Sequence, residues 1–146
     1  MLTLFVSGIT SPVQAQQHKN PASFHGAEAV KKEYKAVFEL NSNDDKVISG
    51  TLRNMANVLK DPRLKDKVKL ELVAHSGGIA VYMKDGKYGP QLKKLTEQGV
   101  ILAACENTMN RKGISKSALF PFVSTVPSGV GELIIRQQQG WAILHP

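Results

Sequence analysis

The chain has 146 residues, of which 42% are hydrophobic and 21% are charged, a composition typical of one globular domain with its own core. No stretch approaches the roughly 18 consecutive apolar residues that a membrane-spanning helix needs. The net charge of +7 is compatible with nucleic-acid binding. However, the lysines lie singly or in pairs among acidic residues and no aromatic and basic motif of an RNA-binding sheet is present, so we expect a solvated basic surface and no nucleic-acid partner.

Residues 1–15 are predicted to be a signal peptide. They begin with an uncharged apolar stretch, and Val13 and Ala15 match the small residues that precede a signal-peptidase cleavage site. We therefore expect a periplasmic or secreted protein with no membrane association after cleavage. The absence of Lys or Arg before the apolar stretch leaves a cytoplasmic location as the alternative. Residues 16–33 are predicted to be a polar leader, with at most a short helix near Ala27–Lys32.

The domain is predicted to span residues 34–146 and to begin with a β-α-β unit. Tyr34–Leu40 and Val68–Ala74 are the two strands. Between them, apolar residues recur at the spacing of one helix face: Ile48, Leu52, Met55 and Leu59. Ser42, with Asp45 three residues later, is the expected N-terminal cap of this helix.

The rest of the chain continues the same alternation of helices and strands. The predicted elements are a helix over about 88–98 with Leu92 and Leu95 inward, a strand over 100–104, helical segments through Met109 and over 115–120, a strand over 122–126, a helix opening at 127–129 and a strand over 141–145. In the last helix, Val130, Leu133 and Ile134 are expected to face the core. This order predicts an α/β protein with three layers, α/β/α, around a mostly parallel five-stranded sheet.

Cys105 is the only cysteine of the chain, and it lies where a buried strand ends and a helix begins. Backbone N–H groups at a helix N-terminus favour an anion, so such a position can lower the pKa of a thiol and supply the reactive thiolate. The alternative is that Cys105 is a small buried hydrophobic residue. With a single cysteine, no intramolecular disulfide can form.

Ligands bind beyond the carboxyl ends of the strands in open parallel sheets. That edge is predicted to gather Cys105 with the candidate binding residues Asn41, Asp44, His75, Asn107 and Ser128. A histidine beside the thiol could orient or deprotonate it, or simply satisfy a loop backbone. No phosphate-binding motif and no metal-ligand spacing occurs, so neither a cofactor nor a metal is expected.

Several segments in this order resemble the DsrE/DsrF-like family. The similarity rests on Asn41–Asp44, Val73–Ile79, Gly99–Met109 and Val126–Val130, followed by Gly140–Pro146. The resemblance implies a YchN-like fold and a homo-oligomer, a trimer or a hexamer. It also implies that Cys105 corresponds to the family's strand-end cysteine, which carries a persulfide in sulfur-relay members.

Two functions follow from the residues and the resemblance. In the first, Cys105 is the nucleophile of a sulfur carrier or sulfurtransferase-like protein that exchanges sulfur with a donor or acceptor protein. In the second, the protein is a non-catalytic, oligomeric binder of small ligands that uses the same edge of the sheet.

Overall fold

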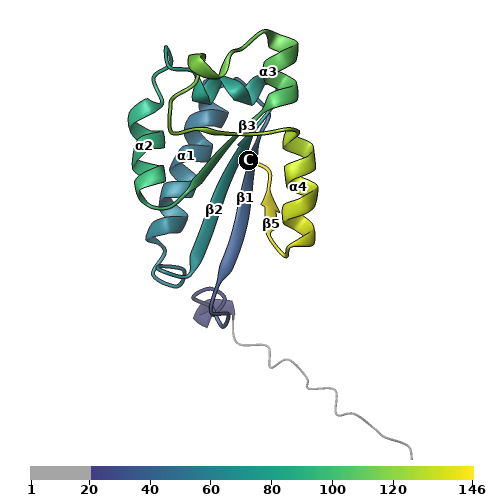
Figure 1. Cartoon of the computed structure of the whole chain (residues 1–146). Helices are drawn as coiled ribbons and strands as arrows, with labels where there is room; N and C mark the ends of the chain where they lie inside the picture. Colours follow the sequence, from purple (N-terminus) through teal and green to yellow (C-terminus); the bar gives the residue numbers. More distant parts are fainter. Residues whose placement is uncertain (1–20) are drawn as a thin grey trace, which may run out of the picture.

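Strands alternate with helices throughout the domain in the computed structural model, which describes residues 21–146 (Figure 1). The predicted signal peptide, residues 1–15, lies outside the described residues. The strands are β1 (Tyr34–Leu40), β2 (Val68–Ala74), β3 (Ile101–Cys105), β4 (Ser124–Val126) and β5 (Ala142–Leu144). The α-helices are α1 (Asp45–Lys60), α2 (Gly89–Glu97), α3 (Glu106–Lys112) and α4 (Gly129–Gln138), and the 3-10 segments are η1 (Pro21–Ser23), η2 (Ser76–Tyr82) and η3 (Lys116–Ala118).

The five strands form one sheet in the order β4-β3-β2-β1-β5, and every strand pair is parallel. The chain steps from β1 outward to β4 and then crosses to the other side of β1 to form β5. Leu40 pairs with Ala74, and Ala74 pairs with Ala104, so the carboxyl ends of the three central strands meet at one edge. The predicted α/β fold with a parallel five-stranded sheet is confirmed.

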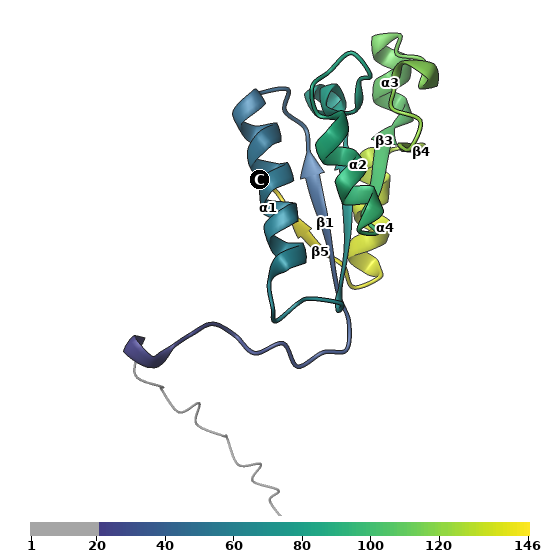
Figure 2. The ribbon, with the colours of Figure 1, turned by 90° about the vertical axis from the view of Figure 1, so that its left-hand side faces the viewer.

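Helices cover both faces of the sheet, which gives the three predicted layers. α1 and α2 lie on one face and α4 lies on the other (Figures 1 and 2). The α1/α2 face is filled by a large apolar cluster that includes Leu40, Leu72, Leu92 and Leu102. The cluster on the α4 face is smaller and consists of Val37, Val73, Ala103, Leu133 and Trp141.

Helix α1 is capped by Asp44 rather than by Ser42. One carboxylate oxygen of Asp44 accepts from the backbone N–H of Lys46 at 2.8 Å and from that of Val47 at 3.1 Å. The hydroxyl of Ser42 instead accepts from the N–H of Asp44 at 3.1 Å. The predicted cap is therefore wrong by two residues, because the turn after β1 uses Ser42 to hold Asp44 in the capping position.

Helix α4 turns a different stripe toward the sheet than its hydrophobic pattern predicted. Leu133 is 9% exposed and faces the core as expected, but Val130 is 54% exposed and Ile134 is 58% exposed. The stripe beneath α4 consists of Gly129, Leu133 and Arg136, which are spaced by about one helical turn. Gly129 allows close approach to the sheet, and the Nε atom of Arg136 lies 2.6 Å from the buried carboxylate of Glu71 on β2.

The polar leader forms no helix at Ala27–Lys32, and its only regular segment within the described residues is the 3-10 turn η1. Gly26 has φ of +106°, which interrupts helical backbone, and Val30 is 84% exposed, so its apolar side chain is not packed against the domain. Short helices are unstable without such packing. Within residues 21–146, no helix is both long enough and apolar enough to cross a membrane.

Candidate functional site

Cys105 is the last residue of β3 and also the N-cap of α3. Its thiol is free and the residue is only 5% exposed. Because Ala74 and Ala104 are register partners in neighbouring parallel strands, the residues that follow them, His75 and Cys105, lie side by side at the carboxyl edge. The strand pairing therefore brings together two of the residues that the sequence singled out.

A third segment approaches the thiol at Gly129, the first residue of α4. A Cβ atom at this position would lie 3.1 Å from the Cβ of His75 and 3.2 Å from the Cβ of Cys105. Such distances are shorter than ordinary contacts between carbon atoms. A glycine is thus what allows the start of α4 to come this close to both residues.

The pKa of the Cys105 thiol is lowered from its usual value. Burial raises the pKa, but hydrogen bonding to the backbone N–H of Gly129, to the hydroxyl of Thr108 and to the backbone N–H groups of Thr108 and Asn107 lowers it by more. No side-chain capping hydrogen bond joins the neutral thiol to α3, and the surrounding donors lower the pKa because they stabilise the charged thiolate. A lowered pKa increases the fraction of thiolate, which is the nucleophile.

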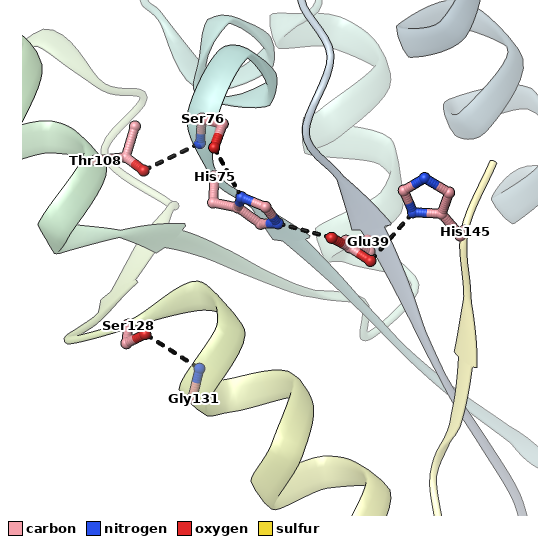
Figure 3. A network of polar contacts seen from close by, with 7 residues as sticks. All are labelled: Glu39, His75, Ser76, Thr108, Ser128, Gly131 and His145. Carbon is pink, nitrogen blue, oxygen red and sulfur yellow. Dashed lines mark hydrogen bonds and ion pairs between the residues drawn. The ribbon is translucent and has the colours of Figure 1, made fainter.

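Glu39 connects two histidines at the same edge (Figure 3). Its carboxylate lies 2.8 Å from Nε2 of His75 and 3.1 Å from Nδ1 of His145. Burial raises the pKa of Glu39, whereas the hydrogen bonds from His75 and His145 lower it, and the net effect is a lowered pKa. This carboxylate joins the ends of β1, β2 and β5.

The orientation of His75 is set by two polar neighbours. Its Nε2 atom contacts Glu39, and its Nδ1 atom lies 3.1 Å from the hydroxyl of Ser76. Both ring nitrogens are thus engaged by groups other than the thiol. This arrangement makes His75 a neighbour of Cys105 that is held by its own network, rather than a base already hydrogen-bonded to the sulfur.

The other candidate residues have different surroundings. Asp44 caps α1, and the hydroxyl of Ser128 caps α4 by accepting from the N–H of Gly131 at 3.1 Å (Figure 3). Asn107 is exposed, and its backbone N–H, which borders the thiol, donates to the carbonyl of Pro127 at 3.3 Å. Asn41 is exposed, in the turn that contacts Gly77. Of these four, only Asn107 and Ser128 belong to segments that border Cys105.

Glu39, Thr108 and His145 take part in the polar contacts of the site but are not among the candidate residues from the sequence. Glu39 lies one residue before the end of β1, so the rule that sites gather at carboxyl ends of strands could have included it. Thr108 is the third residue of α3, a position whose side chain commonly reaches back to the N-cap. Within residues 21–146, no group of three or more His, Cys, Asp or Glu residues is placed to hold a metal ion.

Comparisons with known proteins agree with this architecture. The chain is similar to the protein of unknown function MTH1491 from Methanobacterium thermoautotrophicum, with 34% identity and a TM-score of 0.74 over 78% of this chain and all of that one. It shares the fold of the ychN protein from E. coli, with 17% identity and a TM-score of 0.64 over 80% of this chain and all of that one. The comparison with curated proteins gave no match. Residues 9–146 match the DsrE/DsrF-like family model, and the chain therefore belongs to the DsrE/DsrF-like family.

Proposed function

We propose that the protein is a sulfur carrier in which Cys105 accepts a sulfur atom as a persulfide and passes it to another thiol. The observation that carries this proposal is the arrangement around the thiol. Two segments that are distant in the sequence, the start of α4 at Gly129 and the first turn of α3 at Asn107 and Thr108, place hydrogen-bond donors around one sulfur atom and lower its pKa. Membership of a family often linked to sulfur relay adds support at a coarser level.

The reaction requires no oxidant when the donor already contains sulfane sulfur. With thiosulfate, the Cys105 thiolate attacks the outer sulfur, a new S–S bond forms, and the bond to the sulfonate sulfur breaks, so that sulfite leaves with the electron pair. An acceptor thiolate then attacks the terminal sulfur of the persulfide. That second step forms the acceptor persulfide and releases the Cys105 thiolate.

Intact mass spectrometry tests the proposal directly. After incubation with thiosulfate or polysulfide, we expect a mass increase of about 32 Da, one sulfur atom, which dithiothreitol removes with release of sulfide. Since Cys105 is the only cysteine, the Cys105→Ser variant should show no such increase. Failure of both donors to add sulfur, with a thiol that iodoacetamide alkylates in the folded protein, would contradict the proposal.

The 5% exposure of Cys105 favours one rival function, a non-catalytic binder of small ligands. In that case the thiol is a packing residue at the edge of the sheet. Iodoacetamide would then react only after unfolding, and Cys105→Ala would lower the stability of the native protein by removing a buried sulfur atom. Rapid alkylation of the folded chain would exclude this rival.

We also propose that the protein is a homo-oligomer, a trimer or a hexamer, in which another copy covers the outer side of α4. Val130, Ile134 and Ile135 are each more than half exposed on this helix, directly after Gly129. Light scattering coupled to size exclusion should show the oligomer, and Ile134→Asp should dissociate it. Val30→Asp, a change at an exposed residue of the leader, is the matched control. A monomeric wild-type protein would contradict the proposal.

A further inference from the structure

We propose that Thr108 is a positioning residue for Cys105, because the backbone N–H of Ser76 holds the Thr108 hydroxyl so that its hydrogen is donated to the sulfur. The inference rests on the proposed function, in which Cys105 is the nucleophile. It adds to that function a residue that sets how readily the Cys105 thiol ionises and how well the thiolate acts as a leaving group.

Thr108 lies in the first turn of α3, three residues after the N-cap Cys105. A side chain at this position reaches back toward the N-cap residue, as in a capping box. Thr108 is 3% exposed, so water has little access to its hydroxyl. The hydroxyl must therefore satisfy its hydrogen-bonding capacity within the protein.

Ser76 determines which way the hydroxyl points. The backbone N–H of Ser76 donates to Oγ1 of Thr108 at 3.0 Å (Figure 3). A hydroxyl has one hydrogen and two lone pairs, so accepting from Ser76 leaves the hydrogen free to be donated elsewhere. The sulfur of Cys105 is the acceptor within reach on the same helical turn.

The backbone of Ser76 adopts a conformation that few residues other than glycine adopt. Its φ is +50°, in the left-handed region, and this places its N–H opposite Thr108. The side chain of Ser76 is in turn joined to Nδ1 of His75, whose Nε2 atom contacts Glu39. The Ser76 side chain therefore contacts His75, and it is the backbone N–H of Ser76 alone that contacts Thr108.

A hydrogen bond from Thr108 to sulfur would serve both steps of the reaction. It stabilises the thiolate that attacks the donor. It also stabilises the same thiolate when the acceptor removes the terminal sulfur, which makes Cys105 a better leaving group. A neutral hydroxyl achieves this without placing a positive charge beside the persulfide.

The pH dependence of alkylation tests the proposal. We expect the midpoint for reaction with iodoacetamide to rise in Thr108→Val, so that alkylation at pH 7 becomes about tenfold slower, as a shift of roughly one pKa unit requires. Thr108→Ser keeps the hydroxyl and should stay within about twofold of the wild-type rate. A wild-type midpoint in folded Thr108→Val would overturn the proposal. If that variant does not fold, Thr108→Ala removes the same hydroxyl without adding bulk, and the same outcomes apply.

Ser76→Gly separates the backbone of Ser76 from its side chain. Glycine keeps the N–H and readily adopts a positive φ, so the alkylation midpoint should remain at the wild-type value. A midpoint that rises as far as in Thr108→Val would contradict the assigned role of the N–H.

The sulfur-carrier function and the role of Thr108 can be contradicted separately. If thiosulfate adds no sulfur to the wild-type protein but Thr108→Val still raises the midpoint, only the sulfur-carrier function is wrong. If sulfur is added and the midpoint does not move, only the role of Thr108 is wrong.

Discussion

The two faces of the sheet are filled by different kinds of side chain. Beneath α1 and α2 lies the large apolar cluster, and a polar group there is satisfied from within, since the buried hydroxyl of Tyr82 donates to the carbonyl of Leu72 at 2.6 Å. Beneath α4 lies a smaller cluster together with the ion pair of Glu71 and Arg136. The thiol of Cys105 is at the carboxyl edge of this second face, against the start of α4.

We infer from this difference that one face mainly stabilises the fold and the other mainly affects the reactivity of the thiol. Apolar burial is the main favourable term in folding, so the α1/α2 face should contribute most of the stability. The α4 face contains groups that are costly to bury unless they are paired, and these are also the groups that titrate and react. We therefore expect substitutions on the first face to change stability alone, and substitutions on the second face to change the reactivity of the thiol as well.

The largest effect is expected from Leu92→Ala on α2. Leu92 is fully buried in the large cluster, and the cavity should lower the free energy of unfolding by about 4 kcal/mol. Urea unfolding followed by circular dichroism measures this loss. The alkylation midpoint of Cys105 in the folded variant should equal that of the wild type. A shifted midpoint would show that the two faces are not independent.

A second large effect is expected from Arg136→Met on α4, which leaves the buried carboxylate of Glu71 unpaired. The free energy of unfolding should fall by about 3 kcal/mol at pH 7. Burial already raises the pKa of Glu71, and removing Arg136, whose charge lowers it, should raise it further. The folded state then holds the proton more tightly than the unfolded state, so the variant loses stability as the pH rises above about 4.5, the usual pKa of this group.

The double variant Glu71→Leu/Arg136→Met is the matched control for this pair. It removes both charges, so most of the stability should return and the added pH dependence should disappear. Trp141, the only tryptophan, lies over Arg136 with 4.5 Å between the guanidinium carbon and the ring centroid. Its fluorescence therefore reports on the α4 face alone. A single Arg136→Met variant as stable at pH 7 as at pH 5 would contradict the assigned role of Glu71.

The sequence predicted the fold because the fold depends on local periodicity. Leu92 and Leu95 recur on one face of α2, and the apolar residues of β2 and β3 mark buried strands, so the alternation of elements could be derived residue by residue. The face of α4 was harder to predict. Val130 with Leu133 and Gly129 with Leu133 are both compatible with a helical stripe, and a glycine gives no hydrophobic signal even though it lets α4 approach His75 and Cys105.

The site was predicted in part for a similar reason. Cys105 and His75 follow strands, so their common edge follows from parallel topology. The polar network does not follow from topology, because Glu39 contacts residues 36 and 106 positions away in the chain. Thr108 is likewise oriented by a backbone N–H 32 positions away. Such contacts depend on side-chain geometry that no local pattern in the sequence encodes.

A smaller effect is expected from Gly129→Ala, which adds one methyl group where α4 meets the thiol. The new Cβ would lie 3.1 Å and 3.2 Å from the Cβ atoms of His75 and Cys105, so α4 must move slightly outward. We expect a loss of about 1 kcal/mol in unfolding free energy. The alkylation midpoint should rise, because the N–H of Gly129 withdraws from the sulfur.

Gly50→Ala on α1 is the matched control, since the nearest atom to its added Cβ would be 3.9 Å away. This change should leave the alkylation midpoint unaltered and should not reduce stability. Equal midpoints in Gly129→Ala and in the wild type would mean that the approach of α4 does not activate the thiol.

The smallest effect is expected from Glu39→Gln, and it concerns acid stability. The pKa of Glu39 is lowered in the folded protein because the hydrogen bonds from His75 and His145 outweigh the effect of burial. Its contribution is therefore present above about pH 4.5, the usual pKa of the group, and is lost as the pH falls through the lowered value. Glu39→Gln should cost about 1 kcal/mol at neutral pH and flatten the loss of stability below pH 4.5. Glu97→Gln, at the exposed end of α2, is the control. If the hydrogen bonds from the two histidines do not stabilise the Glu39 carboxylate, the two variants should unfold identically in acid.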